Sequence, residues 1–336
     1  MRRVAALLAA ALLGAALLGC GGGGAEPGAP EGATLVLDFQ PNAVHSGIYA
    51  AQANGYFKDA GIDLHMQEPS GTADSAKLLE AGRADFAVMD INDFGIARER
   101  GLHLDAIAAI VQRPLASVIA RDPNEIRTPA DLSGKTIGVT GVPSDDAVLD
   151  TVLRSGGVDP SSVHRVTIGF NAVAALAAGK VDAATGFWNA EGVELQERGI
   201  PIREFRVDQF GAPRYPELVV ATSRADCPEM VEVIAGLQRG YRALGRDPQG
   251  ALDDVLASVG GLDTGSQRAQ FDALMAAHAF SLTGTEATAA LPKVSTKAWL
   301  SWAIEHGVIA HSAAHRVALG LLASNIACLA GSSPHG

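Results

Sequence analysis

Residues 37–64, LDFQPNAVHSGIYAAQANGYFKDAGIDL, form the stretch that decides the fold. Apolar residues 35–37 at its start predict a buried strand, and residues 45–56 predict a helix. Two glycines then punctuate the exit, and residues 62–66 predict the next strand. Further strands and helices alternate along the rest of the chain. This order predicts an α/β fold with parallel or mixed sheets whose two faces are covered by helices.

A turn at Pro41 and Asn42 separates the first predicted strand from the helix. Polar groups at the carboxyl end of a strand, beside the start of a helix, commonly lie in the ligand crevice of an open α/β sheet. Asn42 and His45 occupy this place, so we expect both to face a ligand. The alternatives are that Asn42 only shapes the turn and that His45 is a helix residue without a ligand contact.

The N-terminus has the pattern of an export signal. Arg2 and Arg3 precede an apolar run that ends in Leu-Leu-Gly before Cys20. A cysteine directly after the small residue resembles the lipoprotein box, in which that cysteine receives the lipid. We therefore expect a lipoprotein signal peptide at residues 1–19, lipid attachment at Cys20 and a flexible glycine-rich tether over residues 20–33.

Composition narrows the class of partner. The formal net charge of −11 gives the protein no general attraction for nucleic acid or anionic lipid head groups. Past the signal, no stretch of sequence is long and apolar enough to span a bilayer. The two remaining cysteines, Cys227 and Cys328, are either buried free thiols or a disulfide, and the sequence leaves this open. No Cys/His spacing indicates zinc.

A repeated pattern indicates two similar lobes. KLLEAGRADFAV at 77–88 and AALAAGKVDAAT at 174–185 share a helix, a glycine, a base and an aspartate before a strand. We expect the first lobe to comprise residues 34–121 and 222–320. The second lobe then comprises residues 122–221, with the polar residues 122–131 crossing between them. Residues 321–336 are left unassigned.

The opening stretch resembles the NMT1/THI5-like substrate-binding proteins, whose typical text is L-D-W-x-P-N-x-x-H-x-G-[IL]-Y-x-A. Phe39 stands at the usual tryptophan position, while Asn42 and His45 match. Further landmarks follow in the family's order: GRADFAV, VQRPLASVIA, DLSGKTIGV, GFWNAEGVEL and PRYPELVVA. The resemblance covers roughly residues 34 to 310.

This resemblance implies a periplasmic-binding-protein fold of the second type, with a ligand cleft between two α/β lobes. Exported members of the family deliver thiamine-precursor pyrimidines to an ABC importer, and some relatives bind riboflavin or other small heterocycles. A cytoplasmic branch synthesises the pyrimidine instead, using pyridoxal phosphate on a lysine and a cysteine-rich iron motif. This sequence has no cysteine cluster, and export would separate the chain from such a cofactor.

An aminopyrimidine is a flat heteroaromatic ring that needs aromatic faces for stacking and a few fixed polar groups at its rim. The segment GFWNAEG follows a predicted strand of the second lobe and supplies both. Glu191 in this segment is expected to accept a hydrogen bond from the ligand's amine. The predicted ligand-binding residues are Phe39, Asn42, His45, Asp90, Trp188, Asn189, Glu191 and Tyr215.

Each aromatic or acidic candidate also has a structural interpretation. Trp188 can belong to the sheet core, because large aromatic side chains are usually mostly buried. Glu191 can complement a helix dipole from the first helical turn. Aspartates near two other predicted helix starts, Asp74, Asp145 and Asp146, argue mildly against an anionic ligand, because they would repel it.

We therefore expect an extracytoplasmic substrate-binding lipoprotein that captures hydroxymethylpyrimidine or formylaminopyrimidine, and not an enzyme. The expected partners are the small heterocyclic ligand, ABC permease subunits and, through the lipid anchor alone, the outer face of the cytoplasmic membrane. We expect a monomer without cofactor, metal or nucleic acid. The alternatives are a receptor for riboflavin or for an aliphatic sulfonate or nitrate, and a pyrimidine-synthesising enzyme.

Overall fold

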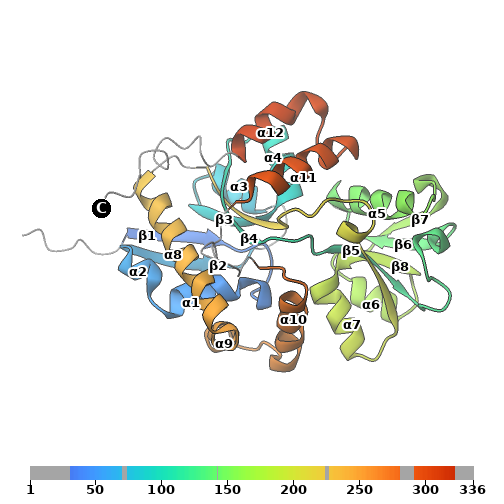
Figure 1. Ribbon diagram of the computed structural model, residues 1–336, viewed down its shortest axis with the longest axis horizontal. Coiled ribbons are helices and arrows are strands. Elements are labelled where there is room, and N and C mark those ends of the chain that lie inside the picture. Colours follow the sequence, from blue (N-terminus) through green and yellow to red (C-terminus); the bar gives the residue numbers. More distant parts are fainter. Residues whose placement is uncertain (1–30, 70–73, 142, 224–226, 281–290, 322–336) are drawn as a thin grey trace, which may run out of the picture.

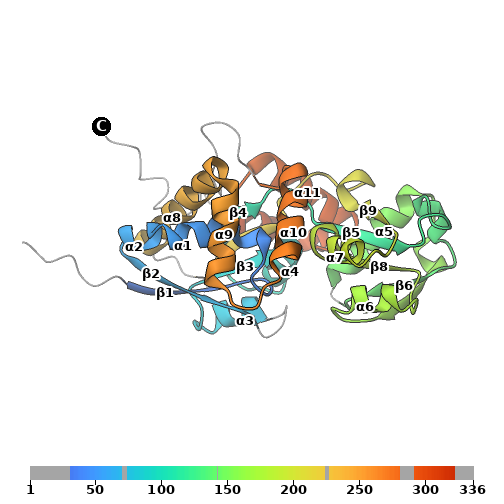
Figure 2. The same cartoon turned by 90° about the horizontal axis from the view of Figure 1, so that it is seen from below.

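Two α/β lobes lie side by side in the computed structural model (Figures 1 and 2). Each lobe contains one five-stranded mixed sheet. The structure describes residues 31–69, 74–141, 143–223, 227–280 and 291–321. The predicted signal peptide, Cys20 and Cys328 lie outside these residues, as does the side chain of Cys227. No helix in the described part of the chain is long and apolar enough to cross a membrane.

The first sheet has the strand order β2-β1-β3-β10-β4. The strands β1, β2 and β3 are parallel, and β10 runs antiparallel to both β3 and β4. The bounds are β1 Glu31–Val36, β2 Ile62–Gln67, β3 Phe86–Asp90, β4 Asp105–Val111 and β10 Leu218–Thr222. Because β1 begins at Glu31, the predicted tether over residues 20–33 extends too far. Pairing with β2, in which Glu31 lies opposite Ile62, extends the strand beyond the apolar residues that reveal it in the sequence.

Helices cover both faces of this sheet, and the helix predicted over residues 45–56 is broken into three pieces. The first-lobe helices are η1 Ala43–His45, α1 Ser46–Ala53, α2 Tyr56–Asp59, α3 Asp74–Glu80, α4 Ile91–Glu99, α8 Cys227–Arg246, α9 Pro248–Ser258, α10 Thr264–Ala276, α11 Lys293–Glu305, η6 His311–Ala313 and α12 Ala314–Gly320. Of these, α10 also packs against the second lobe.

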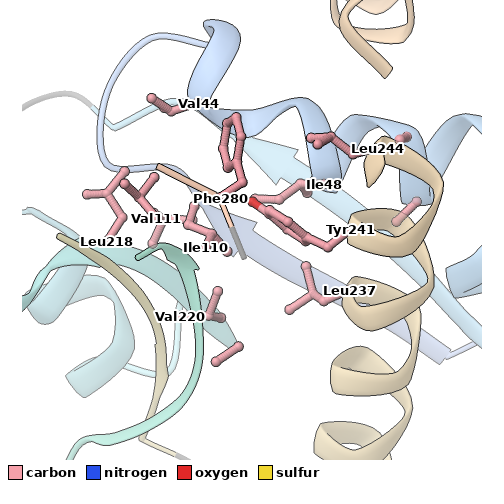
Figure 3. Close-up of a cluster of buried hydrophobic side chains, with 14 of the residues drawn as sticks. Val44, Ile48, Ile110, Val111, Leu218, Val220, Leu237, Tyr241, Leu244 and Phe280 are labelled. Carbon is pink, nitrogen blue, oxygen red and sulfur yellow. The ribbon is translucent and has the colours of Figure 1, made fainter. Parts of the chain in front are cut away.

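On one face, α1 and α8 cross closely over the sheet. Ile48 of α1 and Tyr241 of α8 belong to the buried apolar cluster above strand β10 (Figure 3). A Cβ atom on Gly240 would lie 2.1 Å from the carbonyl oxygen of Gly47, so this crossing requires a glycine. On the other face, Trp299 of α11 is buried and donates from Nε1 to Asn92 Oδ1 of α4 at 2.8 Å.

The second sheet has the order β7-β6-β8-β5-β9. Its strands are β5 Ala116–Arg121, β6 Thr136–Val139, β7 His164–Thr167, β8 Ala183–Phe187 and β9 Ile202–Arg206. The main helices are α5 Pro143–Ser155, α6 Ala172–Ala177 and α7 Val193–Glu197. Shorter pieces are η2 Pro129–Leu132, η3 Pro160–Ser162, the π-helical η4 Trp188–Gly192 and η5 Val207–Gln209.

The repeated pattern performs the same structural task in both lobes. Gly82 ends α3 with a φ of 63°, and Gly179 follows α6 with a φ of 66°, the left-handed conformation that glycine favours. Asp85 then accepts a hydrogen bond from the backbone N–H of Thr34 at 2.7 Å. In the second lobe Asp182 accepts one from the backbone N–H of Thr136 at 2.8 Å. Each aspartate thus joins the central strand of its sheet to the neighbouring parallel strand.

The chain crosses between the lobes at other positions than the sequence predicts. Strand β5 pairs with β8 and β9, so residues 116–121 belong to the second lobe. Strand β10 pairs with β3 and β4, so residues 218–221 belong to the first. The predicted boundaries at 121/122 and 221/222 are therefore wrong. Strands β4 and β5 are separated by four residues, and their different sheet partners are invisible in a local sequence pattern.

Candidate functional site: a cleft between the lobes

A cleft of about 150 Å³ is lined by residues from both lobes. This volume is roughly ten times the ~10–15 Å³ that one water molecule requires on the same measure, so the cleft has room for a small organic molecule. Of the eight predicted ligand-binding residues, five line the cleft and three do not. The five are Phe39, Asn42, Asp90, Asn189 and Glu191.

All the charged residue types that line the cleft among the described residues are acidic, and the remaining polar lining consists of Asn, Ser and Thr. Among the described residues that line it, none is Lys, Arg or His. Burial raises the pKa of three of the carboxyls above the ordinary value and raises that of Asp93 to about 7. The five acids are Asp38, Asp90, Asp93, Asp145 and Glu191. An acid-lined cleft without basic side chains suits a hydrogen-bond donor or a cation.

His45 does not line the cleft but holds residues that do. Its side chain is fully buried, and its Nδ1 accepts a hydrogen bond from the backbone N–H of Asn42 at 3.1 Å. Because a backbone N–H only donates, Nδ1 carries no proton, and the hydrogen atom lies on Nε2 in the neutral ring. Nε2 therefore donates to Asp38 Oδ1 at 2.8 Å. The structure thus places His45 behind the cleft lining, where it orients Asp38, a lining residue that the sequence analysis missed.

Asn42 lines the cleft while capping the turn that precedes α1. Its Oδ1 accepts from the backbone N–H of Val44 at 2.9 Å, and its Nδ2 donates to the carbonyl of Gln40 at 2.9 Å. Both structural and ligand-facing interpretations of Asn42 thus apply. One amide hydrogen and one lone pair remain for a ligand.

The π-helical turn η4 contributes three consecutive residues to the cleft lining, Asn189, Ala190 and Glu191. Asn189 and Glu191 line the cleft, whereas Trp188 is 1% exposed and belongs to the core. Trp188 Nε1 donates to the carbonyl of Pro114 at 3.0 Å, and the Arg206 guanidinium lies 4.1 Å from its ring centroid. The structure thus places Trp188 in the core, as its structural interpretation expects, and outside the lining of the cleft.

Asn189 and Glu191 present different polar atoms to the cleft. Glu191 Oε2 accepts from the backbone N–H of Phe187 at 2.9 Å, which fixes the orientation of its carboxyl group. The buried Oδ1 of Asn189 has no hydrogen-bond partner among the described residues. An unsatisfied buried acceptor is unfavourable by about 1–3 kcal/mol, so Asn189 Oδ1 is prepared to accept a hydrogen bond from a ligand or a bound water.

Tyr215 is also placed away from the cleft. Its side chain is fully buried and stacks on Trp302, with ring centroids 5.6 Å apart. Burial raises its pKa well above the ordinary value, so the phenol stays protonated. The structure thus places Tyr215 outside the lining of the cleft. The aromatic rings that do line the cleft are Phe39, Phe170 and Phe187, of which Phe170 and Phe187 were missed.

Asp90 connects the cleft to the crossing between the lobes. It caps α4, because its Oδ1 accepts from the backbone N–H of Asn92 at 2.6 Å. Its carboxyl also neighbours the buried carboxyl of Glu217, whose Oε2 accepts from the backbone N–H of Leu115 at 2.6 Å. Burial raises the pKa of both acids. Two neighbouring buried carboxyls disfavour a double negative charge, so this pair holds a proton and carries at most one charge.

Proteins of known name are similar to this chain in sequence. A formylaminopyrimidine-binding protein from Halalkalibacterium halodurans is 33% identical over 68% of this chain and 71% of that protein. A 4-amino-5-hydroxymethyl-2-methylpyrimidine phosphate synthase from Legionella pneumophila is 28% identical over 53% of this chain and 56% of that protein.

A solved structure shares the fold. The alkanesulfonate-binding protein from Xanthomonas axonopodis pv. citri, bound to MOPS, matches with a TM-score of 0.65 at 19% identity, over 88% of this chain and 98% of that one. At this identity the likeness concerns the fold alone, which is the periplasmic-binding-protein fold. Residues 42–251 match the family described as NMT1/THI5 like. The chain is a member of the NMT1/THI5-like family.

Proposed function

We propose that this protein is the substrate-binding lipoprotein of an ABC importer and captures a thiamine-precursor pyrimidine in the interlobe cleft. The carrying observation is the polarity of the cleft, which is lined by five carboxyl groups and, among its described residues, by no basic side chain. The exocyclic amine of hydroxymethylpyrimidine or formylaminopyrimidine donates hydrogen bonds to such groups. A ring nitrogen can share a proton with a carboxyl whose pKa is raised, as that of Glu191 is.

The same polarity argues against an anionic ligand. A sulfonate or nitrate needs cationic or N–H donors, and each ionised carboxylate at 4 Å would oppose it by about 4 kcal/mol at an effective dielectric constant near 20. Riboflavin is neutral and flat, so charge does not exclude it. We retain riboflavin as the alternative ligand.

We propose binding rather than pyrimidine synthesis, although relatives in the family are named as synthases. The synthase chemistry implied by the family resemblance needs a lysine beside the substrate. Among the described residues that line the cleft, none is a lysine.

The remaining parts of the proposal rest on the N-terminal sequence. Arg2 and Arg3, the apolar run and Cys20 support export and lipid attachment at the outer face of the cytoplasmic membrane. There a monomer would deliver its ligand to permease subunits. Metabolic labelling with a fatty acid tests the anchor, because Cys20→Ala should abolish incorporation.

The ligand is tested with purified protein whose bound small molecules have been removed by unfolding and refolding. Isothermal calorimetry should detect binding of formylaminopyrimidine or of 4-amino-5-hydroxymethyl-2-methylpyrimidine. It should detect no binding of an alkanesulfonate. Mass spectrometry of the molecules released on unfolding identifies the natural ligand. Tight alkanesulfonate binding without pyrimidine binding would overturn the proposal.

A further inference from the structure

Two exposed phenylalanine rings meet at the cleft from opposite lobes. Phe39 follows β1 of the first lobe and Phe170 precedes α6 of the second, and both line the cleft. Their ring centroids lie 6.0 Å apart, and the ring planes are tilted by 51°. The rings are 45% and 54% exposed, and they are the two exposed aromatic side chains in the described part of the chain. Exposing large apolar rings to water is unfavourable, and exposed apolar surface beside a cleft commonly marks a binding surface.

The loop that presents Phe39 is fixed on both sides of the ring. On one side, the backbone N–H of Leu37 donates to the carbonyl of Gln67 at 2.9 Å, and His45 holds the carboxyl of Asp38. On the other side, Asn42 caps the turn through its own side chain. These bonds predict that Phe39 keeps its position when the cleft is empty, so little ordering entropy is lost on binding.

The loop that presents Phe170 is fixed in a comparable way. The backbone N–H of Ile168 donates to the carbonyl of Val139 at 2.8 Å, and Asn171 Nδ2 donates to the carbonyl of Ile168 at 3.0 Å. Gly169 turns the chain with a φ of 57°. The exposed ring therefore projects from an anchored turn.

We propose that Phe39 and Phe170 clamp the flat ring of the ligand, with each lobe covering one face. This inference rests on the proposed function, because the aminopyrimidine supplies the flat ring. Two stacking contacts at about 3.5 Å each require parallel rings roughly 7 Å apart. The observed 6.0 Å separation lies about 1 Å below this requirement, so a small lobe opening and a rotation of the rings admit the ligand.

The clamp divides the ligand chemically between the two kinds of lining residue. The apolar faces of the heterocycle meet Phe39 and Phe170, while its polar edge meets the carboxyls and Asn189 Oδ1, which no described residue hydrogen-bonds. It also replaces the stacking roles that the sequence assigns to Trp188 and Tyr215, since both of these rings are buried elsewhere. Because the two rings belong to different lobes, binding couples ligand contact to lobe closure.

The competing explanation is a simple apolar latch, in which the two rings only shield one another. A leucine at position 170 would serve a latch, but it offers no aromatic face. We therefore compare Phe170→Ala, Phe170→Leu and Phe170→Tyr. The matched control is Val166→Ala, which truncates a 43% exposed side chain of the same lobe that does not line the cleft. Thermal unfolding of each variant establishes that it is folded.

Calorimetry with formylaminopyrimidine, 4-amino-5-hydroxymethyl-2-methylpyrimidine and riboflavin decides the proposal. We expect Phe170→Ala and Phe170→Leu each to raise the Kd about tenfold, the effect typical of one lost stacking face. Phe170→Tyr should stay within about threefold of the wild type, because its ring face is retained. Val166→Ala should bind as the wild type does.

The outcomes separate the clamp from the proposed function. Pyrimidine binding that is unchanged in Phe170→Ala, or retained in Phe170→Leu, overturns the clamp and leaves the proposed function intact. Binding of riboflavin alone, weakened in both variants, supports the clamp and overturns the proposed pyrimidine. If the wild type binds none of these flat compounds, both proposals fall.

Discussion

The central strands of the two lobes, β3 and β8, are preceded by the same pattern but followed by different structures. Strands β3 and β8 both follow a helix and a left-handed glycine, and both are joined to the neighbouring strand through an aspartate. At its carboxyl end, β3 leads directly into α4 with Asp90 as the cap. In contrast, β8 leads into a π-helical turn, and its cleft-lining acid, Glu191, comes four residues later. The repeated pattern therefore determines where each strand lies, and the following turn determines how its acid is used.

The chemical environments of these two acids differ accordingly. Asp90 shares a proton with Glu217 beside the crossing between the lobes. Glu191 instead accepts from the backbone N–H of Phe187 and lines the cleft together with Asn189, whose Oδ1 has no hydrogen-bond partner among the residues that the structure describes. Asp90 is thus engaged by groups of the protein, and we expect Glu191 of the second lobe to be the acceptor that recognises the ligand.

The largest expected effect concerns the raised pKa of the Asp93 carboxyl in the first lobe. Burial, with Asp90 and Asp145 nearby, raises the pKa of Asp93 from 3.8 to about 7. The native state therefore binds a proton that the unfolded state has released, and the free energy of unfolding falls as pH rises from about 4 to about 7. The Asp93→Asn variant has no titrating carboxyl at this position, so its free energy of unfolding does not fall with pH for this reason. Its stability relative to the wild type should be about 3 kcal/mol more favourable at pH 8 than at pH 5.

Urea unfolding at the two pH values measures this difference. The exposed Asp272, substituted by asparagine in the same way, serves as control and should show no such dependence. If the stability difference between Asp93→Asn and the wild type is the same at pH 5 and at pH 8, the pKa of Asp93 is not raised in the native state.

The second expected effect concerns recognition by the second lobe. Glu191→Gln keeps an oxygen for the backbone N–H of Phe187 but removes the negative charge. Formylaminopyrimidine binding should weaken by about 1–3 kcal/mol, the usual cost of losing a charged hydrogen bond. Calorimetry measures the loss, with Glu194→Gln as control, since Glu194 is exposed and pairs with Arg198. Unchanged affinity in Glu191→Gln would contradict the assignment.

A third prediction tests the equivalence of the two lobes. Asp85→Ala and Asp182→Ala each leave a backbone N–H of the neighbouring strand without its carboxylate acceptor. Each should lower the free energy of unfolding by about 1–2 kcal/mol, and the two losses should be similar. The corresponding asparagine variants retain an acceptor oxygen and should lose less. A loss confined to one lobe would break the structural parallel.

The smallest expected effect belongs to Asp90. Asp90→Asn retains the oxygen that caps α4, and its amide can donate to Glu217 in place of the shared proton. Stability and pyrimidine affinity should therefore both change by less than about 1 kcal/mol. A larger loss of affinity in this variant than in Glu191→Gln would reverse the roles assigned to the two lobes.

The sequence predicted the elements well because their signals are local. The apolar strand at residues 35–37, the helix–glycine–strand repeat and the turn at Asn42 all depend on neighbouring residues. The family resemblance added the two-lobed fold. Three polar residues placed at strand ends by this reasoning, Asn42, Asn189 and Glu191, line the cleft, as does Asp90, which was also predicted to bind the ligand.

Only the tertiary structure decided which of the side chains near the strand ends line the cleft and which are buried elsewhere. Trp188, Tyr215 and His45 turn inward because buried partners satisfy their rings or polar atoms. Contacts with other strands, helices and loops set the positions of five further side chains, namely Phe170, Asp38, Asp93, Asp145 and Glu217. The sheet to which β5 belongs is likewise set by hydrogen bonds to β8 and β9. Such choices depend on contacts between segments far apart in the chain, and a local pattern carries no record of those partners.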